Sequence, residues 1–322
     1  MFTRFVYGQL TGTTAGAATC HPWLVKNNPT TRQHVVSQAL LNRFASPDGL
    51  ISAYDVRWGD TKQKTSKAIG FQENFVKHEP DAAEAIWREV EDRIGPAFTE
   101  IDQQPAQLSA LTEGAVKDLV ALHFARSLAT AAGHEQALAD TERRVRSDTP
   151  TLARLARLKY QGLHLEHAPS ILAEIADGIM ADVRSEESAG IIFRDDVLRY
   201  FGATRTSFTS YSLMVRPVVT GAELLLGDCP AISVSREMAS SSIRSPLFDA
   251  NLIAMPLGPN HVAFVYPDGI EEPVIPVGPE QALHLNGIQV DQASRQVYSR
   301  PGSGLDMMAR ARRAPLRKPD RM

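Results

Sequence analysis

The strongest constraint on the fold of this chain is a change of sequence periodicity near Arg205. From Asp81 to about Val183, apolar residues recur three and four positions apart, which places them on one face of a helix. After Arg205 the chain breaks into short β-type runs separated by Gly, Pro and Asn: SLMVRPVV, ELLLGD, AISVS, NLIAMPL, HVAFVY and VYS. The change predicts an α+β fold, with a helical N-terminal and middle part packed on a mostly antiparallel C-terminal sheet.

The same patterns suggest where the domain begins and ends. Gly, Thr and Ala without a sustained period open the chain, and a basic, nonperiodic stretch closes it. We therefore expect a poorly ordered leader over 1–28, a single α+β domain over 29–302 (helical part 80–200, sheet part 205–300), and a basic disordered tail over 303–322.

Two strand candidates precede the helical part. The first is LISAYDV, which follows the SPDG turn at 46–49. The second covers about 66–71, and we expect it to pair with the first.

Composition excludes several classes of protein. A formal charge of −3 and a pI near 6.3 argue against a wholly basic, duplex-wrapping surface, although a local basic groove stays open. Cys20 and Cys229 lie far apart and match no zinc or disulfide pattern, which fits a reducing, cytoplasmic setting. No run of about 18 apolar residues exists for a membrane span. Walker, Rossmann, GxSxG and HExxH motifs are also absent from the sequence.

His34 and Gln38 lie at the edge of a predicted helix start. Ser37 is a good N-cap candidate, which leaves His34 in the extended segment before the helix and Gln38 in its first turn. His34 there can act as a general base or a metal ligand, with Gln38 orienting it or a water. The alternative is a histidine that hydrogen-bonds to backbone and caps a core.

Glu84, Glu91 and Arg126 form the second candidate group. Glu84 and Glu91 are seven residues apart and flank the stripe of Trp87 on one helix face. Glu91 has no oppositely charged residue four positions on, and Arg126 lies on an apolar helix face where a guanidinium needs an acceptor. This predicts a Glu91–Arg126 bridge, either as a buried interhelix ion pair or as a carboxylate beside an arginine that holds phosphate.

Asp228 follows the apolar run LLLG and precedes Cys229 and Pro230. A carboxylate at a strand end can enter a cleft, and it can equally shape the bend as an Asx-turn. Both interpretations stay open from the sequence.

Taken together, these segments resemble a family of bacterial proteins, domain of unknown function 4238. The resemblance spans about 33–298 and follows the order of its short motifs: His34 and a helix start with Leu41 and Phe44, Tyr54-Asp55, Asn74-Phe75, Glu84 and Glu91, Arg126, Gly227-Asp228-Cys229-Pro230, Pro256-Leu257 and Asn286. Ser37 stands where the family has Pro, and Cys229 where it has Asn. The second change removes a side-chain amide beside Asp228.

The family supplies no activity, but the resemblance implies that its polar positions recur together across the helical part and the sheet part. We therefore expect His34, Glu84, Glu91, Arg126 and Asp228 to meet at one cleft, with Gln38 and Asn74 as further candidates.

The favoured function is metal-dependent hydrolysis of a phosphodiester, in nucleic acid. Glu84, Glu91 and Asp228 would hold Mg²⁺ or Mn²⁺, His34 would be the general base, and Arg126 would bind the phosphate. The alternative is a noncatalytic module that binds a ligand or partner and uses the same residues as a buried structural network.

Overall fold

The computed structural model describes residues 31–160, 169–234, 252–267 and 274–313, so the predicted leader over 1–28 lies outside the described residues. The chain divides into two compact units where the sequence suggested a single domain. The smaller unit contains residues 131–194 and the larger one residues 30–130 and 195–322, each less the undescribed positions. The smaller unit has its own apolar cluster, which includes Leu152, Ala156, Ile175 and Ala176.

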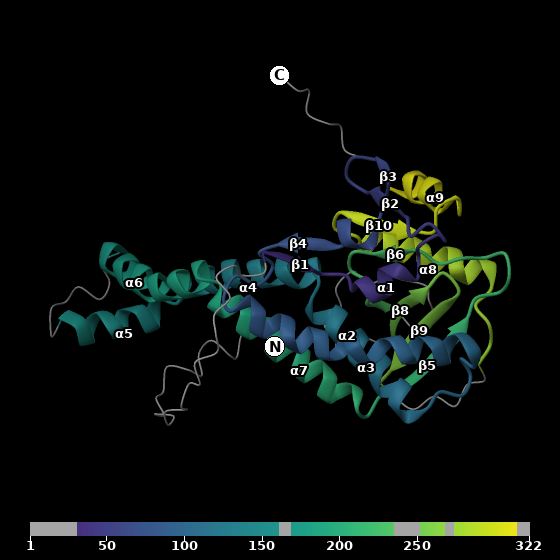
Figure 1. Cartoon of the computed structure of the whole chain (residues 1–322). Helices are drawn as coiled ribbons and strands as arrows, with labels where there is room; N and C mark the ends of the chain where they lie inside the picture. The colour runs from purple at the N-terminus through teal and green to yellow at the C-terminus, as the bar shows by residue number, and fades with distance from the viewer. Residues whose placement is uncertain (1–30, 161–168, 235–251, 268–273, 314–322) are drawn as a thin grey trace, which may run out of the picture. The chain divides into compact units, whose positions relative to one another are not determined.

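The predicted helical part is confirmed, with helices from Pro80 to Phe208. They are α2 (Pro80–Gln103), α3 (Ala110–Ala125), α4 (Leu128–Ser147), α5 (Thr149–Tyr160), α6 (Pro169–Ser188) and α7 (Ile191–Phe208). In the larger unit α2 packs against α3 (Figure 1). The predicted stripe of α2 is the buried one, with Trp87 and Ile94 fully enclosed.

The predicted antiparallel sheet region is also confirmed, and each of the six β-type runs contains a strand. One sheet has the order β5 (Ser212–Pro217), β9 (His261–Tyr266), β8 (Leu252–Gly258) and β7 (Ile232–Val234). Another has the order β3 (Thr61–Lys64), β2 (Ile51–Asp55), β10 (Gln296–Ser299) and β6 (Leu226–Gly227). All strand pairs in both sheets are antiparallel.

The strand expected over 66–71 as the partner of LISAYDV is wrong. Residues Ser66–Ala68 form a 3₁₀ turn, and β4 (Phe71–Glu73) pairs instead with β1 (Arg32–His34). The partner of β2 is β3, whose four residues are all exposed. An edge strand without a buried face has no apolar alternation by which the sequence could reveal it.

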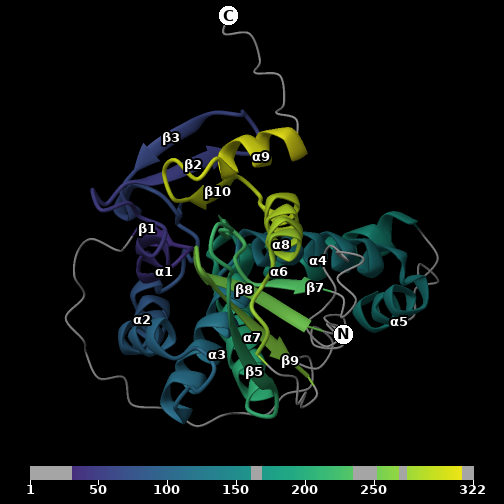
Figure 2. The same ribbon diagram turned by 90° about the vertical axis from the view of Figure 1, so that its right-hand side faces the viewer.

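The expected disordered tail over 303–322 needs correction, because α9 occupies Leu305–Arg312. Its Leu305, Met308 and Ala309 pack on the apolar cluster of β2 and β10, and Figure 2 shows α9 lying beside those strands. Arg312 further binds both carboxylate oxygens of Asp291 on α8 (Pro279–Gln292), at 2.9 and 2.6 Å. Three apolar side chains suffice here because they complete an existing cluster. Residues 314–322 lie outside the described part.

In the part of the chain that the structure describes, no helix combines the length and the apolar character that crossing a membrane requires.

Candidate functional site

A buried ion pair between α2 and α3 is the centre of the candidate site. Arg126 ends α3 and its backbone N–H donates to the carbonyl of Leu122 at 2.7 Å. Its side chain is 1% exposed, donates from Nη2 to Oε1 of Glu91 at 2.5 Å, and places Cζ 5.0 Å from the centre of the Trp87 ring. The predicted Glu91–Arg126 bridge is therefore confirmed as geometry.

The segment between β1 and the short helix α1 (Gln38–Asn42) brings His34 and Gln38 together. Gln38 Nε2 lies 3.3 Å from His34 Nδ1, the proximity expected from the sequence. Ser37 occupies the N-cap position of α1, but its hydroxyl makes no capping hydrogen bond. The predicted helix start is correct, without the bond that usually fixes one.

Gly70 holds the segment between β1 and α1 in place through backbone hydrogen bonds. Its carbonyl accepts the backbone N–H groups of Val35 and Val36, at 2.9 and 3.0 Å. Its φ of +68° is the left-handed region, and a Cβ at this position would lie 2.7 Å from Cδ1 of Leu41. Glycine is thus required for α1 to pack where it does.

Electrostatics connect His34 and Glu84 to the ion pair. Burial lowers the pKa of His34, and the charge of Arg126 lowers it further, while the Ser66 backbone and Glu91 partly oppose them. Burial raises the pKa of Glu84; Glu91 adds to the rise and Arg126 opposes it. His34 is therefore held neutral, and Glu84 is a stronger base than an ordinary carboxylate.

His123, which the sequence analysis missed, belongs to the same group. It is fully buried one helical turn before Arg126, and burial followed by the charge of Arg126 lowers its pKa to about 3. The Val35 backbone opposes the shift, which places that segment against the ring. The available signal was the three-residue spacing from Arg126 on one helix.

Several buried polar atoms of this group lack a hydrogen-bond partner within the described residues. They are Glu84 Oε1, Trp87 Nε1 and Arg126 Nε; the ring nitrogens of His34 and His123 lack a well-formed bond but face the backbone of Ser66 and Val35. Native interiors leave few such atoms unsatisfied, and a concentration of them marks a place for water, an ion or a ligand. Arg126 Nε and Trp87 Nε1 are obligatory donors, so the group favours a partner that accepts hydrogen bonds.

The hydrogen bonds of Asp228 lie at the start of β10 and not on the residues of this group. Its carboxylate accepts the backbone N–H groups of Ser294, Arg295 and Gln296 at 2.8, 2.7 and 3.0 Å. Burial raises the pKa of Asp228 although those three bonds lower it. Asp228 thus anchors the start of β10. Within the described ranges, no three His, Cys, Asp or Glu side chains are arranged to hold a metal ion.

Asn286 and Asn74 also have local structural explanations. Asn286 accepts the backbone N–H of Leu225 and donates to the carbonyl of Glu223, both at 2.8 Å, so it tethers α8 to the segment before β6. Asn74 is exposed just after β4 with a φ of +51°, a left-handed conformation that asparagine tolerates better than most residues.

Comparison with known proteins agrees with the suspected resemblance. A family model described as "Protein of unknown function (DUF4238)" matches residues 32–303. No curated protein matches the chain. No solved structure matches it either.

Proposed function

This chain belongs to the DUF4238 family of proteins of unknown function, and from that premise we propose that the group around Arg126 hydrolyses a phosphodiester bond, with nucleic acid as the substrate. Arg126 and His34 would bind the phosphoryl oxygens, and Glu84 would activate water. The unpartnered, buried donor atoms beside the Arg126–Glu91 pair carry the proposal.

The donor chemistry favours phosphate. Glu91 occupies Nη2 of Arg126, but Nε of the same guanidinium has no partner among the described residues. A planar guanidinium is well suited to phosphate oxygens, and its hydrogen bonds strengthen when charge develops in a site shielded from water. Trp87 Nε1 adds an uncharged donor on the face of α2 that carries Glu84 and Glu91.

The hydrogen bond between Gln38 and His34 indicates which ring nitrogen of His34 carries the proton, and therefore which catalytic role His34 can take. In the orientation observed, the Gln38 amide donates to Nδ1, so a neutral His34 carries its proton on Nε2. His34 is then a hydrogen-bond donor to the phosphoryl group. The base role expected for His34 passes to Glu84, whose pKa is raised. A water oxygen forms the new bond to phosphorus as the bond from phosphorus to the leaving oxygen breaks; the water proton passes to Glu84, and the leaving oxygen is protonated from solvent.

The expected Mg²⁺ or Mn²⁺ would be held by Glu84 and Glu91, because the Asp228 carboxylate is occupied at β10. Two carboxylates are a usual protein contribution for Mg²⁺, with water and substrate oxygens completing the shell. The bound ion would neutralise charge on the phosphoryl group. Adding a chelator distinguishes the two proposed roles of Glu84. If Glu84 acts as a general base, turnover persists without the metal ion; if it acts as a metal ligand, turnover is lost. We place the reaction in the cytoplasm, where the free thiol of Cys229 stays reduced.

The test is turnover of bis(p-nitrophenyl) phosphate, single-stranded DNA and RNA, with and without Mn²⁺. His34→Ala and Glu84→Gln should lower kcat by about 100-fold or more while remaining folded. Glu89→Gln, an exposed glutamate of the same helix, is the matched control and should behave as the parent. A parent protein inactive on all three substrates, or folded variants with full activity, would refute the proposal.

A second candidate is a noncatalytic module in which this network fixes helix packing. The observation in its favour is that Arg126 and Trp87 are 1% and 0% exposed. At such buried positions the contacts of Arg126 with Glu91 and Trp87 stabilise the packing of α2 against α3. Turnover and thermal melting together distinguish the candidates, because this one predicts a parent protein without turnover and a lowered Tm on removal of either partner of the Arg126–Glu91 pair.

A further inference from the structure

A second polar surface lies at one end of the sheet that contains β2 and β10, and we propose that it binds single-stranded nucleic acid. It consists of Trp58, Arg295, Arg310 and Arg313, and is called the arginine end below. The binding does not depend on hydrolysis by the group around Arg126.

Three backbone contacts bring the arginine end together. The backbone N–H of Val56 donates to the carbonyl of Arg295 at 2.9 Å, which holds the turn after β2 beside the start of β10. Arg310 donates from Nη2 to the carbonyl of Gly59 in that turn, at 2.5 Å, and Arg313 from Nη1 to the carbonyl of Ala293, at 2.6 Å. Segments more than 230 residues apart in the chain thus meet at one edge.

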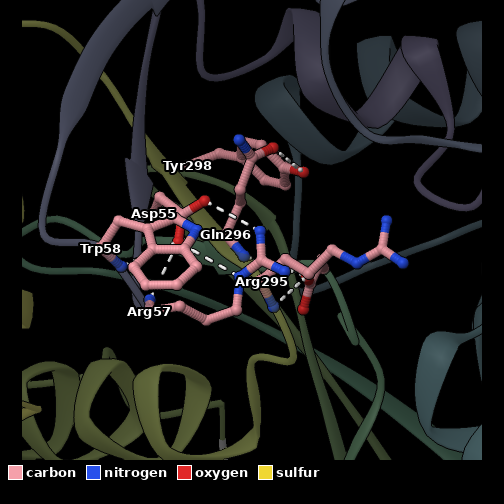
Figure 3. Close-up of polar contacts among 7 residues, drawn as sticks. Asp55, Arg57, Trp58, Arg295, Gln296 and Tyr298 are labelled. Atoms are coloured by element: carbon pink, nitrogen blue, oxygen red, sulfur yellow. Dashed lines mark hydrogen bonds and ion pairs between the residues drawn. The ribbon is translucent and has the colours of Figure 1, made fainter. Parts of the chain in front are cut away.

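The turn that contains Trp58 is held by hydrogen bonds to Asp55. The Asp55 carboxylate accepts the backbone N–H groups of Arg57 and Trp58, at 2.9 and 3.1 Å, and pairs with the Arg57 guanidinium. Partial burial raises the pKa of Asp55, but these bonds lower it overall, so the carboxylate stays charged. Figure 3 shows Arg57 and Trp58 gathered around Asp55, and Arg295, just before β10, with its side chain extending away from Trp58.

Arginine side chains concentrate positive charge on this surface. Arg310 and Arg313 are held by carbonyls, which fix the guanidinium without neutralising it, and their remaining N–H groups stay available. Arg295 is exposed and its side chain makes no hydrogen bond or ion pair with any described residue. Among the carboxylates nearby, Asp55 pairs with Arg57, Asp306 accepts from Thr61 at 3.2 Å, and the buried Asp228 interacts electrostatically with Arg295.

The combination of arginines and Trp58 favours single-stranded nucleic acid as the ligand. Three guanidiniums, two of them fixed by backbone carbonyls, are complementary to a run of phosphates. The half-buried Trp58 offers an indole on which an unpaired base can stack. A duplex keeps its bases stacked on each other and could use only the arginines.

The experiment measures fluorescence anisotropy of a labelled single-stranded oligonucleotide with His34→Ala protein, which leaves the probe intact, over a range of salt. Each of Arg295→Ala and Arg313→Ala should weaken binding severalfold and reduce the slope of log affinity against log salt by about 0.7. Trp58→Ala should weaken binding about fivefold or more, and Trp58→Phe should restore most of it.

Arg143→Ala is the matched control, since Arg143 is a 72% exposed arginine on α4 of the other unit. It should leave both affinity and salt slope unchanged. Binding that Arg295→Ala, Arg313→Ala and Trp58→Ala leave at the control level would overturn the proposal. So would tighter binding to the duplex of the same sequence, or to anionic lipid vesicles. The same substitutions made in the parent protein should leave hydrolysis of bis(p-nitrophenyl) phosphate unaffected, so the two proposals fail separately.

Discussion

Arg126 and Glu91 form an unequal ion pair: the guanidinium is 1% exposed and the carboxylate 27% exposed, although Nη2 and Oε1 are only 2.5 Å apart. Water can therefore take over from Arg126 as the partner of Glu91, but it has little access to Arg126. The two partners should differ in what their removal costs.

We predict that Glu91→Ala lowers the free energy of unfolding more than Arg126→Met does. The first change leaves a buried cation without its carboxylate, which costs about 3–5 kcal/mol. The second leaves a carboxylate that reaches solvent, and methionine fills much of the vacated volume. Urea unfolding measures both, with Glu89→Ala as a surface control expected within about 0.5 kcal/mol of the parent. Equal losses would contradict the unequal burial of the pair.

His123 should make stability depend on pH. Its pKa is about 3 in the folded protein and 6.5 ordinarily, so below pH 6.5 the unfolded chain binds more protons. The stability associated with neutral His123 is thus present above pH 6.5 and is lost as pH falls toward 3. The advantage of the parent over His123→Leu should shrink by about 1.4 kcal/mol for each pH unit in that window.

Urea titrations at several pH values check this prediction. Leu122→Ala, a neighbouring buried position, serves as the control because it removes no titrating group. Its loss of stability should be the same at every pH. A His123→Leu protein whose difference from the parent is also constant with pH would show that the buried imidazole is already protonated or hydrated.

Local periodicity carried most of the information about secondary structure. The stripe through Trp87 predicted α2, and the six β-type runs predicted strands, because each has one face or both faces in a core. The same logic located the Arg126–Glu91 pair, since an arginine on an apolar helix face must find an acceptor.

The failures share a different physical cause. The strand β3 has no buried face, and α9 buries only a few side chains against a cluster formed by distant segments. Asp228 is occupied by N–H groups some 66–68 residues further along the chain. In each case the deciding partner comes from another part of the fold, and no local pattern encodes it. The family resemblance grouped Asp228 with the other polar positions, because an aspartate that anchors a strand and an aspartate that takes part in a reaction look the same in the sequence.

Glu84 should trade stability for function. Its folded pKa is raised above the ordinary 4.5, so the folded protein binds the extra proton and stability declines as pH rises past 4.5. Glu84→Gln mimics the protonated form. We predict a higher Tm than the parent at pH 7, no gain below pH 4.5, and loss of turnover. Differential scanning calorimetry at the two pH values checks it, and a lower Tm at pH 7 would show that Glu84 is needed as a carboxylate for folding.

Asp228 supports the last prediction, which separates an anchor from a metal ligand. Asp228→Ala leaves three partly buried backbone N–H groups without their acceptor, and an unsatisfied donor costs at most about 1–3 kcal/mol. Asp228→Asn should also destabilise, because its NH₂ group would face donors where the carboxylate accepts. The fraction that folds should keep the parent's turnover and the parent's response to Mn²⁺. A metal ligand would behave in the opposite way, since Asp228→Asn would then melt near the parent temperature and lose the metal response. Thermal melts and Mn²⁺ titrations of turnover on the same samples therefore decide whether Asp228 acts on β10 or on the substrate.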